Sequence, residues 1–311
     1  MCARSILAAA LSLAALAAAS PVLADKDPEI APYRPLEEKN FLSGKATIDP
    51  SKGYFYLHGK GPAFGVFLRI PDEQDLADYR FLTEKAYAKA LRSYERAVAS
   101  YDNDAKIARN VGRPVPALPV RPDAATFSIG DIGLRTNVPV GPFSRFSKAS
   151  GESSFLEEVK PGTYIYYGPL VSGPNGAMGT CFCMGSVRFE VKAGQITDLG
   201  DFLKVAPDWA SQALSDLDPK AREQLSGPQT PHFGLPASLA SYPSVQAKFH
   251  ASGKLNNFVG AMVSRMPPVP GVLAYDRDVA IDVATGERVV LGFARPAGLA
   301  SAAIPSAAAQ P

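Results

Sequence analysis

The feature that most constrains this chain is a long segment, from Glu73 to Arg109, that contains neither proline nor glycine. Ala, Leu, Lys, Arg and Glu dominate it, and this composition favours an α-helix. Its apolar side chains recur every seven residues and form one stripe: Tyr87, Leu91, Tyr94, Val98, Tyr101 and Ala105. We predict one helix over 73–109. At 1.5 Å per residue it would be about 50 Å long, which is too long to lie wholly on a small sheet.

The stripe can be buried in three ways. It can pack on the chain's own domain, pair with the helix of a second copy, or be interrupted by a helix break near Asn103. Packing on the chain's own domain is favoured, because the repeat covers only about three heptads and tyrosine is a poor residue for a coiled-coil seam. Self-association through the long helix stays open. Basic residues on the same helix are interpreted as a solvated face: Lys85, Lys89, Arg92 and Arg96.

Four prolines follow the helical segment within residues 112–123, at positions 114, 116, 119 and 122. Such a density of proline predicts a stiff connector close to the polyproline II conformation. The PxxP spacing is also found in ligands of proline-binding domains. In an exported protein we favour the connector.

The N-terminus has the three-part order of a secretory signal peptide. Arg4 precedes an apolar run from Ile6 to Ala19, and Pro21 and Val22-Leu23-Ala24 follow before Asp25. The run is shorter than the roughly 20 residues of a membrane span, so we expect cleavage after Ala24 rather than retention as an anchor. Because Cys2 lies upstream of the run, lipid anchoring is not expected. The sequence thus predicts a protein that is periplasmic or secreted.

Strand-like patterns lie on both sides of the helical segment. Phe64, Val66, Leu68 and Ile70 alternate with other residues, and the Gly59–Pro62 stretch before them suits a hairpin loop. Further strands are expected at 54–57, 155–159, 163–167, 181–191, 196–199, 245–250, 272–283 and 288–291.

We therefore predict a mainly β (α+β) fold, an antiparallel β-sandwich with one long helix inserted after the first strands. The expected divisions are a signal peptide at 1–24, an N-terminal arm at 25–50, the β-sandwich domain at 51–295 with its helical insertion at 73–109 and Pro-rich connector at 112–123, and a disordered tail at 296–311. A short helical patch around Trp209 completes the domain.

Two expected turns have sequence patterns that also occur in a known type of β-sandwich module. Pro161-Gly162-Thr163-Tyr164 leads into one strand, and Val191-Lys192-Ala193-Gly194 leads towards Thr197. In their PGxY and V-x-A-G-x-x-T patterns, these segments resemble carboxypeptidase-regulatory, or prealbumin-like, β-sandwich modules. The resemblance implies an antiparallel sandwich in which each turn closes a hairpin. The chain as a whole is similar to uncharacterised exported proteins of alphaproteobacteria, for which no activity is implied.

Cys181 and Cys183 form the cluster that most strongly suggests a chemical site. Met184 follows them, and thiolate and thioether ligands suit copper(I). If 181–191 is one strand, both cysteines face the same side as Val187, Phe189 and Val191, whereas Met184 faces away. Structural packing of small apolar thiols is therefore favoured. A disulfide in a bulged strand and a metal site remain as alternatives.

Asp276, Asp278 and Asp282 alternate along the expected strand at 272–283. A row of carboxylates on one face would bind a hard cation such as Ca²⁺. The usual twelve-residue calcium loop is absent, so a solvated face is the favoured interpretation and the three residues are weak metal candidates.

The histidines show no catalytic pattern. His58 lies beside a glycine-rich turn, His250 lies at a strand end, and His232 has no histidine neighbour at metal-ligand spacing. A nucleophile elbow, a phosphate-binding loop and an HExxH motif are all missing from the sequence. We therefore assign no catalytic and no cofactor-binding residue.

Charge further limits the functions. The 32 basic residues nearly balance the 30 acidic ones, which argues against a nucleic-acid partner. The sequence predicts a non-enzymatic binding or scaffold protein of the cell envelope, without a cofactor, whose partner is an unidentified envelope protein or glycan. The alternatives are a periplasmic hydrolase that uses His58 or His250, and a thiol- or copper-handling protein that uses Cys181 and Cys183.

Overall fold

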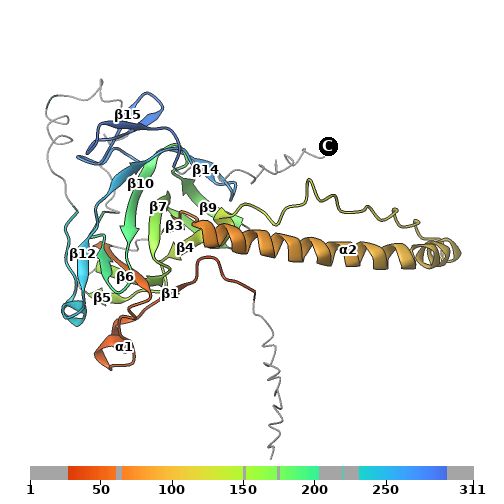
Figure 1. The fold of residues 1–311 in the computed structure, drawn as a ribbon, viewed down its shortest axis with the longest axis horizontal. Coiled ribbons are helices and arrows are strands. Elements are labelled where there is room, and N and C mark those ends of the chain that lie inside the picture. Colours follow the sequence, from red (N-terminus) through yellow and green to blue (C-terminus); the bar gives the residue numbers. More distant parts are fainter. Residues whose placement is uncertain are drawn as a thin grey trace, which may run out of the picture.

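The computed structural model describes residues 27–60, 65–149, 152–173, 176–202, 219 and 231–292. This part of the chain is mainly β, with several antiparallel sheets and one long helix, as predicted (Figure 1). The leader, Trp209 and the tail lie outside the described residues. Within the described ranges, no helix combines the length and the apolar character that a membrane crossing requires.

A six-stranded sheet, called sheet A here, forms one half of the body. Its strand β11 runs parallel to both of its neighbours, which the sequence did not predict, and the other pairs are antiparallel. The strands in spatial order are β1 (Tyr33–Pro35), β6 (Glu152–Val159), β2 (Gly53–Lys60), β11 (Ile196–Asp198) and β12 (Ser244–Gln246), with β5 (Ser147–Ala149) also paired to β6.

A five-stranded sheet, called sheet B here, is antiparallel throughout. Its strands in spatial order are β13 (His250–Ser252), β10 (Ser186–Val191), β7 (Gly162–Gly168), β3 (Gly65–Arg69) and β4 (Asn137–Val140). The helix follows β3 directly, and the chain returns from it to β4.

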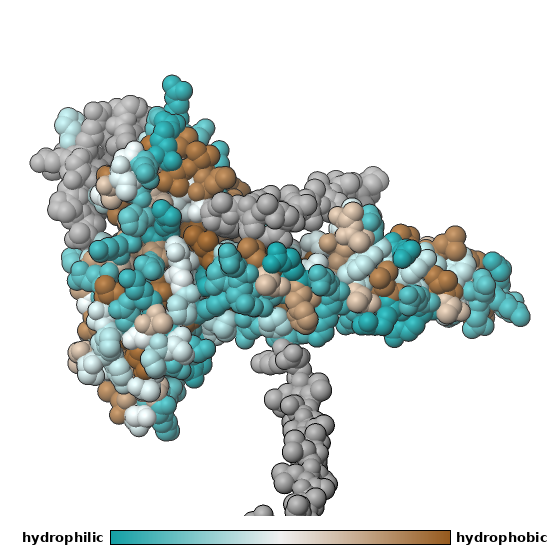
Figure 2. Space-filling view, in the orientation of Figure 1, coloured by the Kyte–Doolittle hydropathy of each residue, from teal (hydrophilic) through white to brown (hydrophobic). Residues whose placement is uncertain are grey.

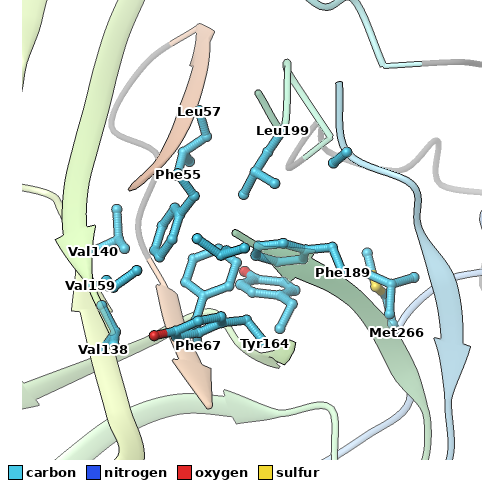
Figure 3. Packing of buried hydrophobic residues seen from close by; sticks show 14 of the residues in the cluster. Phe55, Leu57, Phe67, Val138, Val140, Val159, Tyr164, Phe189, Leu199 and Met266 are labelled. Atoms are coloured by element: carbon cyan, nitrogen blue, oxygen red, sulfur yellow. The ribbon is translucent and has the colours of Figure 1, made fainter. Parts of the chain in front are cut away.

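Sheets A and B share one apolar core. Phe55 from sheet A and Phe67 from sheet B are fully buried, with ring centroids 5.1 Å apart. Figure 3 shows these rings with Tyr164 and Phe189 at the centre of the cluster. Phe189 packs edge-to-face against both Phe55 and Phe67, which adds to the hydrophobic stabilisation from burial alone.

Consecutive strands cross from one sheet to the other, so the predicted hairpins are wrong. β2 and β3 lie in different sheets, and so do β6 and β7, and β10 and β11. The reason is that β2 is buried on both faces: Phe55 and Leu57 enter the shared core, while Tyr54 and Tyr56 enter a second cluster. The expected strand at 245–250 is likewise divided between the two sheets.

Smaller elements cover the body. One three-stranded sheet has the order β14 (Met262–Val263), β9 (Gly176–Cys181) and β8 (Leu170–Gly173). A second has the order β15 (Leu273–Asp276), β16 (Val279–Asp282) and β17 (Glu287–Val289), with a turn at Thr285-Gly286 between the last two strands. The short helices are α1 (Glu38–Leu42), α3 (Gly133–Thr136) and a 3-10 turn at Ala237–Leu239.

The predicted long helix is confirmed as α2 (Glu73–Asn110), which runs without a break at Asn103. Its 38 residues span about 57 Å. In Figure 1, α2 leaves the body at β3 and projects away from it, and the following segment returns beside it. We call α2 together with residues 111–131 the projecting arm.

Candidate functional site

The projecting arm is held at its base by four charged side chains. Arg69, the last residue of β3, is only 3% exposed and forms an ion pair with Asp75, which is fully buried. The same guanidinium lies 2.5 Å from the Asp72 carboxylate, and the Lys160 ammonium donates to Asp75 Oδ1 at 2.7 Å. Two cations and two carboxylates thus fasten the first turn of α2 to the ends of β3 and β6. We call these four residues the base cluster.

The two carboxylates also begin the helix. Asp72 is the N-cap, and its side chain accepts a hydrogen bond from the Asp75 amide at 2.8 Å. Asp75 accepts from the Asp72 amide at 2.8 Å, which completes a capping box. The helix start and the ion cluster therefore share the same atoms, so the helix direction is fixed by the sheet.

Backbone and charge reinforce this geometry. Arg69 Nε donates to the Pro161 carbonyl at 3.0 Å, and a Cβ atom at Gly162 would lie 2.9 Å from that nitrogen. Glycine at 162 leaves room for the guanidinium. Burial raises the pKa of Asp72, but the hydrogen bond from Arg69 and the charges of Arg69 and Lys160 outweigh this and hold it below its ordinary value.

The far end of the arm is a defined reversal of the chain. Gly112 adopts a positive φ of 66° and donates to the Arg109 carbonyl, and the Arg113 amide donates to the Ala108 carbonyl at 2.9 Å. This pair of bonds is a Schellman motif, which ends a helix at a left-handed glycine. Beside it Ala105 and Ala108 are buried, although they lie far from the body.

The returning segment packs on the predicted apolar stripe near the body. Tyr87 contacts the ring of Phe127 with centroids 5.2 Å apart and donates to the Pro122 carbonyl at 3.4 Å. Tyr79, about two turns closer to the base, donates to the Gly130 carbonyl at 2.5 Å. The prolines thus lie in the second leg of the arm, which connects the tip of α2 back to the body.

The outer face of the arm is solvated, as predicted for its basic residues. Lys85, Lys89, Arg92 and Arg96 are all exposed. Apolar side chains are also exposed along the arm, among them Val98 at 48% and Ile107 at 52%. Figure 2 shows the resulting mixture of hydrophilic and hydrophobic residues over the arm.

The cysteines require a correction. They are buried as predicted, but Cys181 and Cys183 form a disulfide with Cα atoms 5.1 Å apart. The expected single strand over 181–191 is also wrong, since β9 ends at Cys181 and β10 begins at Ser186. The cysteines consequently pack with Tyr167 and Leu170 in a cluster separate from the core that holds Phe189.

The disulfide can be tested by counting the free thiols of the protein before and after reduction. Unfolded without a reductant, the protein is expected to show no reactive thiol beyond Cys2, and that one only if the leader is retained. Reduction should release two more. Closing so short a loop stabilises the fold by only about 1.5 kcal/mol, so the reduced protein should stay folded. Maleimide labelling followed by mass spectrometry measures both states. Two thiols that react before reduction would contradict the disulfide.

The aspartates do not form a row. The expected strand at 272–283 is a hairpin that turns at Arg277, a non-glycine residue with a φ of 54°. Asp276 contacts Arg288, Asp278 lies exposed in the turn, and Asp282 is buried at the opposite end of the hairpin. Among the described residues no group of three His, Cys, Asp or Glu side chains is arranged to hold a metal ion.

His250 has an oriented partner. Its Nδ1 lies 3.1 Å from Asp282 Oδ2, and Asp282 also accepts from the amides of Ala251 and Ala284. The imidazole side chain is 42% exposed. A histidine held by a buried carboxylate in this way can act as a general base, provided that a nucleophile reaches it. In the described part of the chain, Asp282 is its only hydrogen-bond partner.

His58 lies elsewhere, so the two candidate bases do not share a site. It belongs to β2 in sheet A, whereas His250 belongs to β13 in sheet B. Its Nε2 lies 3.0 Å from the His232 carbonyl oxygen, and His232 Nδ1 lies 3.1 Å from Asp201 Oδ2. These contacts tie the end of β2 to the chain around residue 232.

The base cluster was missed by the sequence reasoning, although signals for it were present. Arg69 is a cation in an otherwise apolar strand, and Asp72 and Asp75 have the spacing of a capping box. Glu157 was also missed. It is 1% exposed on the same strand face as Phe155 and Val159, and its Oε2 has no hydrogen-bond partner within the described chain.

Comparison with known proteins adds no relative. The chain matches no family model, no curated protein and no solved structure. Its function therefore has to be argued from the projecting arm and the body themselves.

Proposed function

We propose that this chain is an exported, non-enzymatic protein of the cell envelope that acts as a scaffold or binding protein by presenting the projecting arm to a partner. The observation that carries the proposal is the arm itself. Its helix spans about 57 Å and is fastened to the body by the buried pair of Arg69 and Asp75. A long element that is anchored only at one end exposes most of its surface to other molecules.

Three further features support this role. The N-terminal leader pattern predicts export, and the Cys181–Cys183 disulfide suits an oxidising compartment such as the periplasm. The shared core of sheets A and B fits a β-sandwich body. Such a body is a scaffold on which function is carried by attached elements. The partner we favour is another envelope protein, with a glycan or a second copy of the chain as alternatives.

Excision of the outer arm tests the proposal. Residues 91–119 would be replaced by a short Gly-Ser turn, which keeps the contacts of Tyr79 with Gly130 and of Tyr87 with Phe127. Crosslinking in intact cells is expected to recover a partner with the full-length protein and to lose it with the excised variant. The body should melt within a few degrees of the parent, because the base cluster and both sheets are retained.

The melting temperature is the control for folding. If the excised variant is folded and recovers the same partner in the same yield, the arm is not the binding element and the proposal fails. A crosslinked product of twice the chain mass would identify the partner as a second copy.

A hydrolase is the second candidate, since the 3.1 Å contact between His250 and Asp282 is an oriented acid–base pair. It would appear as ester or peptide hydrolysis by the purified protein that is lost in His250→Ala and kept in His58→Ala. Copper handling by Cys181 and Cys183 would require that their buried disulfide first be reduced.

A further inference from the structure

The return leg of the arm is stiff by composition. From Arg113 to Pro122, the four prolines and the four residues that directly precede them account for eight of the ten residues. Proline fixes its own φ near −65°, and it also restricts the preceding residue to extended conformations. No helix or strand is formed over 113–123. The segment is therefore held close to polyproline II even when nothing binds it.

Polyproline II has three residues per turn, so the segment presents three edges. One edge contains Arg113, Pro116, Pro119 and Pro122. Of these, Pro119 and Pro122 are half-buried, and Pro122 accepts the hydrogen bond from Tyr87 of the helix. The other two edges are exposed to solvent. They carry Val115, Leu118 and Arg121 on one, and Pro114, Ala117 and Val120 on the other, and all six are exposed. We call these two edges the proline ridge.

The proline ridge is unusually apolar for a solvated segment. Leu118 is 70% exposed and Val120 is 87% exposed, and Val115 is 42% exposed. Two arginines, Arg113 and Arg121, lie near its ends, and no acidic residue occurs between them. An apolar ridge with a cation near either end complements a groove that is apolar in the middle and acidic at its ends.

We propose that the proline ridge is the ligand of a proline-binding domain in a partner protein, whose shallow groove is lined by Tyr, Trp or Phe side chains and flanked by carboxylates. Preformed polyproline II loses little conformational entropy on binding, and its edges pack between aromatic rings. Val115 and Leu118 would enter the groove, and Arg121 would pair with a flanking carboxylate. This inference rests on the proposed function, since it names the class of partner that the projecting arm engages.

A photo-crosslinking amino acid at Ala117 tests the proposal in the full-length protein inside intact cells. Ala117 is exposed between the two apolar contacts of the ridge. We expect an adduct with one protein, mapped by mass spectrometry to a groove that contains aromatic and acidic residues. Leu118→Asp and Arg121→Glu should each lower the adduct at least tenfold. Lys106→Glu makes the same charge reversal at an exposed site on α2 and should leave the adduct unchanged.

Exchanging the charges of Arg121 and of its partner carboxylate tests whether these two groups pair with each other. Changing the flanking carboxylate of the partner to lysine should restore the adduct of Arg121→Glu. The proposal is overturned by an adduct that maps to lipid, to a second copy of this chain, or to a partner surface without aromatic residues. It is also overturned if Leu118→Asp keeps the adduct. If arm excision abolishes the partner while Leu118→Asp keeps it, the proposed function stands and only this inference fails.

Discussion

Replacing Asp75 with alanine is expected to lower the free energy of unfolding by about 3–5 kcal/mol, because it leaves the buried guanidinium of Arg69 without its main counter-charge. Arg69 is 3% exposed, so water cannot take the place of the lost carboxylate. The same substitution removes half of the capping box that begins α2. Equilibrium unfolding in urea, followed by circular dichroism, measures the change.

Glu73→Ala is the matched control. Glu73 is an exposed acid in the same helical turn, and its removal costs only its interaction with the helix dipole, below about 1 kcal/mol. The paired replacement of Arg69 by methionine and Asp75 by leucine removes both buried charges at once, and it should cost much less than Asp75→Ala alone. Equal losses for Asp75→Ala and Glu73→Ala would show that the base cluster does not hold the arm.

Replacing Glu157 with methionine is expected to raise the free energy of unfolding at pH 8 by about 1–3 kcal/mol. The carboxyl is 1% exposed, Oε2 has no hydrogen-bond partner among the described residues, and burial raises its pKa well above the ordinary value. An acid with a raised folded-state pKa binds more protons folded than unfolded, so its folded state loses stability as pH rises above about 4.3. Methionine has a similar volume and no charge, so it removes this penalty.

The pH dependence of the stability difference separates the removal of the buried charge from a change in packing. The difference between Glu157→Met and the parent should be largest at pH 8 and should shrink towards about pH 3, well below the unfolded-state pKa of about 4.3, where the parent carboxyl is protonated in both states. Glu152→Gln, at the exposed start of the same strand, should show no such trend. Urea unfolding at several pH values gives both curves. A loss of stability in Glu157→Met at every pH would mean that the carboxylate has a partner.

Local sequence patterns predicted the positions of helices and strands better than they predicted which strands pair in a sheet. Helix α2 was predicted within one residue because proline and glycine are absent from the segment and strong helix formers dominate it. The strand at 162–168 was equally visible. The pairing of the strands could not be predicted in the same way. Phe55 and Phe67 could face each other across a core or lie side by side in one sheet, and the sequence does not distinguish these two arrangements. Local resemblance to hairpin turns then favoured the wrong choice.

The strand assignments around the candidate site residues were wrong for a related reason. Cys181, Cys183 and the three aspartates were placed by assuming unbroken strands, and both strands contain a turn, at Cys183-Met184 and at Arg277-Asp278. A single interruption shifts every later side chain to the other face. Arg69 and Asp75 are close in sequence, yet their burial with Lys160 depends on β6, which lies far along the chain. Sequence spacing alone could not reveal that contact.

The hairpin form of the arm has a consequence for how the protein reaches its native state. β3 and β4 are adjacent strands, but all of residues 70–136 lie between them. A flexible loop of that length would make their encounter slow and entropically costly. Helix formation takes microseconds or less, and the stiff return leg then brings the two strand ends together at Tyr79 and Gly130. The arm thus turns the pairing of two strands that are distant in sequence into a nearly local contact.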